Sequence, residues 1–147
     1  MDLLRLQFER EDEWHGKLTA TVSARAFAGL GSARFSTEEL RQFAAAASAF
    51  PLQEESLPSI RGGFGGSAEA VEQVHLALAF APHDKRGTIL ATVQLATEVW
   101  NTEEADLASN VTVRFLVTYG DLGRFGPAVI QLLNGEGTEA TLQSSVT

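Results

Sequence analysis

The sequence predicts a single α+β domain: an antiparallel sheet of about six strands in the order β-β-β-α-β-β-β-α, with two helices packed on the sheet. Two observations support this fold. Six segments alternate apolar and polar residues with the period of a half-buried strand, and two segments repeat apolar residues with the period of a helix. Short connections between consecutive strands favour antiparallel pairing. The 147 residues, 44% of them hydrophobic, are enough for one core.

Three strands are expected before the first helix. They span residues 3–9, 14–24 and 27–35. The inward side chains are then Leu4, Leu6 and Phe8 in the first strand, and Leu18, Ala20, Val22 and Ala24 in the second. In the third strand Gly29 and Gly31 indicate either a weakened strand or a bulge.

The first helix is predicted from Thr37 to Ala49. Ser36 and Glu39 have the spacing of a capping box, in which each side chain accepts from the other residue's backbone N–H. The helix is expected to stop before Pro51, because proline disfavours helical geometry in the residue that precedes it. Its apolar stripe consists of Leu40, Phe43, Ala44 and Ala47.

A flexible loop is expected over residues 52–67, which contain Pro58 and the glycine-rich run Gly62–Gly66. The run lacks the Lys-Ser/Thr pair of a phosphate-binding P-loop. Its composition therefore favours a plain connection, and the role of the run stays open.

Three further strands are predicted over residues 71–80, 88–97 and 110–119, followed by a second helix that Asp121 can cap. Pro127 is expected either to kink this helix or to separate its first turn from the rest. Asn134-Gly135 is typical of a helix end. The domain is then expected to span residues 1–135. Residues 136–147 are mostly small and polar, which predicts a weakly ordered C-terminal tail.

The net charge of −8 favours basic partners and disfavours nucleic acids and anionic membranes. Simple solubility is the alternative explanation of that charge. The chain has no cysteine, no signal-peptide pattern at Met1 and no apolar run long enough to span a membrane. We therefore expect a cytoplasmic protein.

No pattern in the sequence indicates catalysis. The three histidines, His15, His75 and His83, have no metal-ligand spacing, and no serine lies in a GxSxG turn. The alternation places His75 on the solvent face of its strand, opposite Leu76 and Leu78. We expect a non-enzymatic protein with no cofactor and no metal.

Two segments combine a tryptophan with acidic residues, the combination of an aromatic anchor and a charged rim for a basic protein. The first segment contains Glu98, Trp100, Glu103, Glu104 and Asp106, and the second contains Glu11, Asp12, Glu13 and Trp14. Trp100, Glu103, Glu104, Asp106 and Trp14 are therefore the candidate partner-binding residues. The alternative is that the tryptophans cover sheet edges while the acids are merely solvated.

One pattern extends over most of the chain, from about Trp14 to Leu133. It consists of Trp14, Leu18, Ala20 and Val22, the runs 26–29 and 35–43, the alternating strand pair around Gly87, and the last strand and helix. This layout resembles small bacterial WapI-type immunity proteins and their uncharacterised relatives. The resemblance implies a cytoplasmic, non-enzymatic protein that binds and neutralises a partner toxin. The glycine-rich loop and the longer tail depart from that pattern.

Two other functions remain open from the sequence. One is a helix-grip domain, whose curved sheet wraps a helix around a pocket for a small apolar ligand. Helices usually follow the first strand of such folds, whereas three strands precede the helix here. The other is a degenerate interaction domain that has no activity of its own and whose role the sequence does not indicate. The oligomeric state is likewise open.

Overall fold

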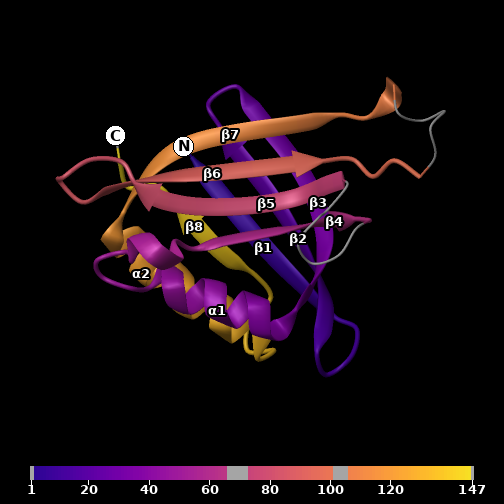
Figure 1. Ribbon diagram of the computed structural model, residues 1–147, viewed down its shortest axis with the longest axis horizontal. Helices are drawn as coiled ribbons and strands as arrows, with labels where there is room; N and C mark the ends of the chain where they lie inside the picture. The colour runs from indigo at the N-terminus through magenta and orange to yellow at the C-terminus, as the bar shows by residue number, and fades with distance from the viewer. Residues whose placement is uncertain (1, 66–72, 101–105, 147) are drawn as a thin grey trace.

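The computed structural model describes residues 2–65, 73–100 and 106–146. Within them the chain is α+β, with two α-helices and two four-stranded antiparallel sheets rather than the one sheet of about six strands that was predicted (Figure 1).

Sheet A has the order β3-β2-β1-β8 and sheet B the order β4-β5-β6-β7. Sheet A contains β1 (Leu3–Arg10), β2 (His15–Ala24), β3 (Phe27–Ser36) and β8 (Ala140–Gln143); sheet B contains β4 (Ser59–Phe64), β5 (Gln73–Pro82), β6 (Thr88–Ala96) and β7 (Asn110–Thr118). The helices are α1 (Thr37–Ala47) and α2 (Tyr119–Leu133), with a short 3-10 helix, η1 (Glu54–Ser56).

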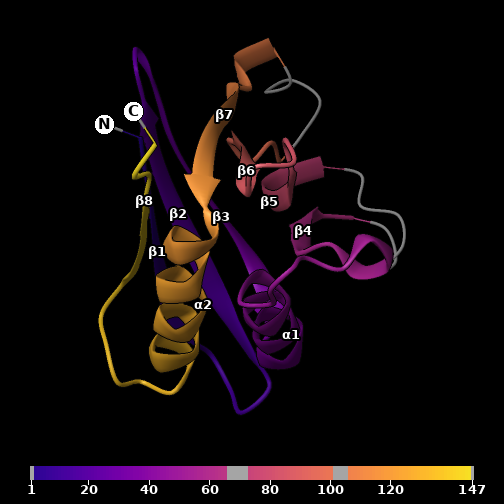
Figure 2. The ribbon, with the colours of Figure 1, turned by 90° about the vertical axis from the view of Figure 1, so that its left-hand side faces the viewer.

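The two helices pack side by side, and each contacts strands of both sheets. Helix α1 contacts β3 and β4, whereas α2 contacts β1, β8 and β7. Figure 2 shows the pair against the face of sheet A and beneath sheet B. Among the described residues, neither helix has the length and apolar character needed to cross a membrane.

The sheets meet along β3, which contacts all four strands of sheet B. A Cβ atom added to Gly29 would collide with Val111 of β7, and one added to Gly31 would lie 2.6 Å from the carbonyl oxygen of His75 in β5. These glycines therefore allow β3 to cross the other sheet at close range. They mark this close approach rather than the bulge or weakened strand expected from the sequence.

The predicted inward faces form the core. The inward positions of β2 and the helical stripe of α1 are buried, as are Leu4 and Leu6 of β1, whereas Phe8 is only partly buried against the core. At its centre Phe43 of α1 stacks on Phe80 of β5, with ring centroids 5.7 Å apart, and both rings meet Phe125 of α2 edge-on. One aromatic cluster thus joins both helices to sheet B.

The capping box of α1 is present as predicted. The Glu39 N–H donates to Ser36 Oγ at 3.1 Å, and the Ser36 N–H donates to Glu39 Oε1 at 3.2 Å. The helix ends at Ala47, two residues before the predicted end, because Ser48 forms the C-cap and its hydroxyl bonds the Ala44 carbonyl. The helix therefore ends before Phe50, the residue whose conformation Pro51 restricts.

Helix α2 also begins with a capping box, but its N-cap is Thr118 and not Asp121, the cap that the sequence predicted. Thr118 is the N-cap, and Asp121 is the third helical residue whose carboxylate returns to the Thr118 N–H at 2.9 Å. Pro127 lies inside α2, which remains one helix through it.

The segment predicted to be a flexible loop contains β4, which pairs with β5 through the glycine run. A Cβ atom on Gly63 would overlap the Gln73 backbone. The glycines here serve close strand pairing, so the prediction of a loop was wrong for Gly62 to Phe64, whereas Gly65 lies in a bend after β4.

The C-terminal segment also differs from the prediction of a weakly ordered tail. Ala140 and Leu142 of β8 are buried opposite Leu6 and Leu4 of β1. Two apolar side chains in a polar sequence are too few to indicate a strand locally, but β1 supplies both the hydrogen bonds and the apolar surface. The domain therefore continues past residue 135.

Candidate functional site

A surface pocket of about 390 Å³ lies where β3, the end of β4, the start of β5 and the segment after β6 come together. Its walls include Lys17, Arg34, Phe64, His75, Glu98 and Trp100. Residues from three separate parts of the sequence thus share one site, and we take it as the candidate functional site.

His75 lies at the bottom of the site because of a β-bulge. Gly62 pairs with Leu76 and Gly63 pairs with Val74, so His75 is the extra residue of β5 without a partner in β4. Bulges redirect the side chains they contain. The His75 side chain is only 2% exposed, and the prediction that it lies on the solvent face was therefore wrong.

The Gln73 side chain connects His75 to the opposite wall. Its Nε2 donates to the Val99 carbonyl at 2.9 Å, and its Oε1 accepts from the Val99 N–H at 3.3 Å. The same Oε1 lies 2.9 Å from His75 Nε2. One amide therefore fixes both the imidazole and the backbone that leads to Trp100.

Trp100 forms the outer aromatic wall. Its ring centroid is 4.5 Å from that of Phe64, which in turn meets the His75 ring edge-on at 4.5 Å. Despite this contact the Trp100 residue is 72% exposed. A large aromatic side chain is thus held in place while most of its surface faces solvent.

The charged walls of the pocket are mixed. Arg34 Nε bonds Glu11 Oε1 at 3.0 Å, which offsets the charge of that guanidinium. Lys17 faces Arg34 across the β2–β3 pairing and lies opposite Glu9 in β1. Glu98 has no ion-pair partner among the residues that the structure describes.

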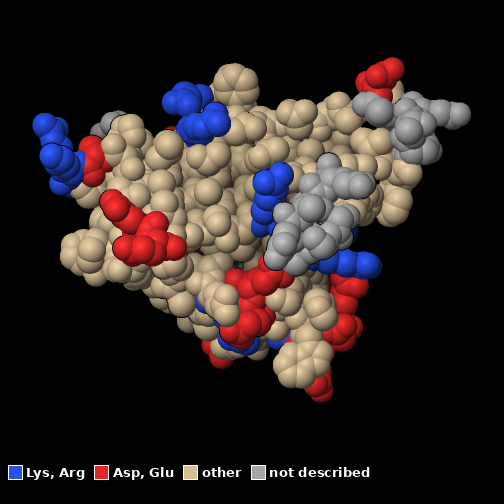
Figure 3. Space-filling view, viewed as in Figure 1, with Lys and Arg blue, Asp and Glu red and all other residues tan. Residues whose placement is uncertain are grey.

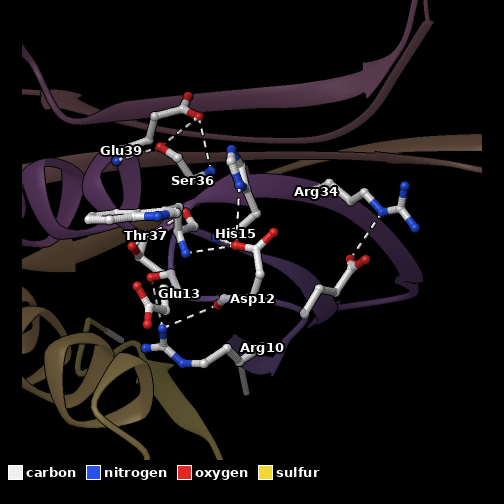
Figure 4. A network of polar contacts seen from close by, with 10 residues as sticks. Arg10, Asp12, Glu13, His15, Arg34, Ser36, Thr37 and Glu39 are labelled. Carbon is white, nitrogen blue, oxygen red and sulfur yellow. Dashed lines mark hydrogen bonds and ion pairs between the residues drawn. The ribbon is translucent and has the colours of Figure 1, made fainter.

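The other predicted tryptophan, Trp14, belongs to the turn between β1 and β2, shown with its polar contacts in Figure 4. Its N–H donates to Asp12 Oδ1 at 2.7 Å, and its carbonyl accepts from the Thr37 N–H at 2.8 Å. The bonds from the N–H groups of Trp14 and His15 hold the pKa of Asp12 below its ordinary value. Trp14 itself is 68% exposed, so the turn presents it from a fixed backbone.

Arg10 fastens the same turn to the rest of the molecule. Its guanidinium donates to the carbonyls of Glu13 at 3.1 Å and of Leu133, at the end of α2, at 2.8 Å. The Glu11–Arg34 ion pair then connects the turn to the wall of the pocket. Trp14 lies in the β1–β2 turn and Trp100 in the pocket wall, and the Glu11–Arg34 ion pair links that turn to that pocket.

Acidic side chains are unevenly placed on the face shown in Figure 3. They form separate groups over the first turn of α1, which contains Glu38 and Glu39, around the β1–β2 turn, and over η1. Much of the surface over sheet B on this face is uncharged.

The structure brings only part of the predicted partner-binding set together. Trp100 lines the pocket, Trp14 lies on the neighbouring turn, and Asp106 is exposed but does not line the pocket. Glu103 and Glu104 lie outside the described residues. Phe64 and His75 were not predicted, because the bulge that turns them toward Trp100 leaves no periodic signal.

No group of three or more His, Cys, Asp or Glu side chains in the described part of the chain is arranged to hold a metal ion. Comparison with known proteins finds no matching family model, no matching curated protein and no matching solved structure. The resemblance to WapI-type immunity proteins therefore stays a hypothesis that depends on the sequence pattern.

Proposed function

We propose that this chain is a non-enzymatic, cytoplasmic protein-binding domain that docks a basic partner, in the manner of the immunity proteins it resembles. The toxin-neutralising role of those proteins makes a toxin domain the first partner to test. The proposed docking surface consists of the pocket around Trp100 and the turn that presents Trp14.

The exposure of Trp100 is the observation that carries this proposal. Aromatic residues at interfaces contribute most when they are rigid and already in position, because little side-chain entropy is then lost on binding. Phe64 supports one face of Trp100 and the Gln73–Val99 bonds hold its backbone. These contacts position Trp100 without burying it, because most of the residue remains exposed.

The Trp14 turn supports the same proposal independently. The bonds from Asp12, Thr37 and Arg10 hold the turn without covering the indole. Glu11 and Glu13 precede Trp14 in the same turn and are exposed. An exposed tryptophan with an acidic rim fits a basic surface that has an apolar depression.

The contacts of His75 favour binding over catalysis. Its ring partner is the neutral Gln73 amide, which lacks the negative charge with which the carboxylate of a catalytic triad stabilises the protonated imidazole. The His75 ring also meets Phe64 edge-on. We therefore assign His75 a place in the pocket wall and not the role of a general base.

Binding kinetics test this function. The purified chain is combined with the basic protein encoded beside it, and dissociation is followed by surface plasmon resonance. Trp100→Ala should raise the dissociation rate at least about tenfold, since buried aromatic anchors act mainly on dissociation.

Phe50→Ala is the matched control, because Phe50 is equally exposed but packs on Tyr119, away from the pocket. It should leave the dissociation rate unchanged. Absence of a complex with the neighbouring protein, or equal effects of the two substitutions, would contradict the proposal.

A further inference from the structure

We propose that the pocket formed by Phe64, His75 and Trp100 binds the guanidinium group of an arginine side chain on the partner. The inference rests on the proposed protein-binding function and names the chemical group that the site recognises. It depends on three properties of the pocket: a free hydrogen-bond acceptor, flat aromatic walls and an unpaired carboxylate.

The acceptor follows from the orientation of Gln73. The Val99 peptide group offers one donor and one acceptor, so Gln73 Nε2 must face its carbonyl and Oε1 its N–H. Oε1 also contacts His75 Nε2 at 2.9 Å. An amide oxygen cannot donate, so Nε2 of His75 carries the proton and, in the neutral ring, Nδ1 is an acceptor.

The second ring nitrogen of His75, Nδ1, is the candidate acceptor for a ligand. It has no hydrogen-bond partner among the described residues. Every buried side-chain nitrogen or oxygen in that part of the chain does have a partner, so Nδ1 cannot be fully enclosed. Since His75 lines the pocket, this nitrogen can accept from a ligand N–H group there.

The aromatic walls favour a planar cation. Phe64 and Trp100 meet with an interplanar angle of 52°, and His75 stands at 88° to Phe64. A guanidinium group can stack on an aromatic face and still donate from its edge, whereas a strongly hydrated ammonium cannot do both as well.

The charges around the pocket bear on whether it takes a cation or an anion. Glu98 is unpaired among the described residues, while Arg34 is held by Glu11. Lys17 acts against a cation and offsets Glu98 within the walls, but it lies opposite Glu9 in β1. The wall charges therefore nearly cancel, and the net charge of −8 of the whole molecule favours a cation. A cationic ligand makes opposite predictions for Glu98 and Lys17.

The probe for this site is N-acetyl-arginine amide, titrated into the ¹⁵N-labelled full chain and followed by NMR. The indole N–H signal of Trp100, assigned with a Trp100→Phe variant, should shift saturably, and that of Trp14 should serve as an internal reference. N-acetyl-citrulline amide, which is planar but uncharged, and N-acetyl-lysine amide should bind at least about fivefold more weakly. Absence of a saturable shift at Trp100, or equal binding of citrulline, would overturn the assignment.

Three variants that each remove one charge complete the test. Glu98→Gln should weaken arginine binding by about two- to fivefold, and Lys17→Gln should strengthen it by a similar factor. Glu136→Gln, which is exposed and does not line the pocket, should have no effect. Weaker arginine binding in Lys17→Gln would show that the pocket does not recognise the positive charge of arginine and would overturn the proposal.

The arginine titration and the partner kinetics can fail separately. If arginine does not bind while Trp100→Ala still weakens the partner complex, the ligand assignment is wrong and the protein-binding function stands. If arginine binds with the expected selectivity but no partner complex forms, the pocket assignment stands and the proposed function is wrong.

Discussion

Asp121 connects the C-terminal segment to the start of α2. Its side chain is fully buried and accepts from the backbone N–H groups of Thr118 at 2.9 Å and Ser145 at 3.1 Å, and from Arg124 Nη2 at 2.8 Å. Burial by itself raises the pKa of Asp121, but the hydrogen bonds from Thr118 and Ser145 favour the carboxylate and hold the pKa below its ordinary value of 3.8.

Asp121→Asn should therefore lower the free energy of unfolding at pH 7 by about 1–3 kcal/mol, because the amide replaces a charged acceptor and places a donor opposite backbone N–H groups. A depressed folded pKa stabilises the protein above the unfolded pKa, and that stabilisation is lost as pH falls through the folded value. The difference between wild type and variant should thus be complete at pH 7 and shrink below about pH 4.

Urea unfolding at pH 7 and pH 3 measures this effect. Asp106→Asn makes the same charge change at an exposed residue and should leave stability unaltered at both pH values. A constant difference between wild type and Asp121→Asn across this range would show that the lost stability comes from packing and not from the ionised carboxylate.

At the scale of elements, the contact between α1 and α2 depends on a glycine. A Cβ atom added to Gly126 would lie 2.9 Å from the Ala44 carbonyl oxygen and would overlap the Ser48 hydroxyl. By contrast, a Cβ atom on Gly123 in the same helix would have nothing within 4 Å. The absence of a side chain at Gly126 therefore lets the helices approach closely, while at Gly123 it has no such role.

Gly126→Ala should destabilise the protein by about 1–3 kcal/mol, since the backbone of α1 must move to admit the methyl group. Gly123→Ala should stabilise it by about 0.5–1 kcal/mol, because alanine is the better helix former and meets no neighbour. Thermal unfolding of the two variants checks both signs. A stabilising Gly126→Ala would show that the helices can separate without cost.

For the whole molecule, the net charge of −8 should act mainly on the rate at which a basic partner is encountered. Screening by salt shortens the reach of such charges from about 10 Å at 0.1 M to about 3 Å at 1 M. The association rate constant should therefore fall steeply as the ionic strength rises, while the dissociation rate changes little.

The position of the charges can be tested with a pair of double variants. Glu13→Gln with Asp106→Asn removes exposed acids from the two tryptophan-containing segments, and Glu54→Gln with Glu136→Gln removes two exposed acids elsewhere. The first pair should slow association more at low salt and flatten its salt dependence, with no loss of stability. Equal association rates of the two double variants would indicate that the acids near the tryptophans are only a solvated surface.

Much of this architecture could be predicted from neighbouring residues alone. The box of Ser36 and Glu39, the stripe through Phe43 and the alternation of the inward strands depend on contacts two to four residues apart along the chain. The exposure of Trp14 and Trp100 agrees with the acidic, non-periodic segments that contain them. Such features follow from helix and strand geometry, whatever the rest of the chain does.

The division into two sheets, strand β8 and the pocket depend instead on contacts between distant segments. Ala140 and Leu142 become a strand because β1 offers an unpaired edge, and His75 is buried because β4 pairs with β5 across a bulge. A shift of one residue in strand register moves a side chain to the opposite face, and no local pattern records where such a shift occurs. The location of His75 beside Trp100 is therefore a property of the folded pairing, set by which apolar faces can be buried together.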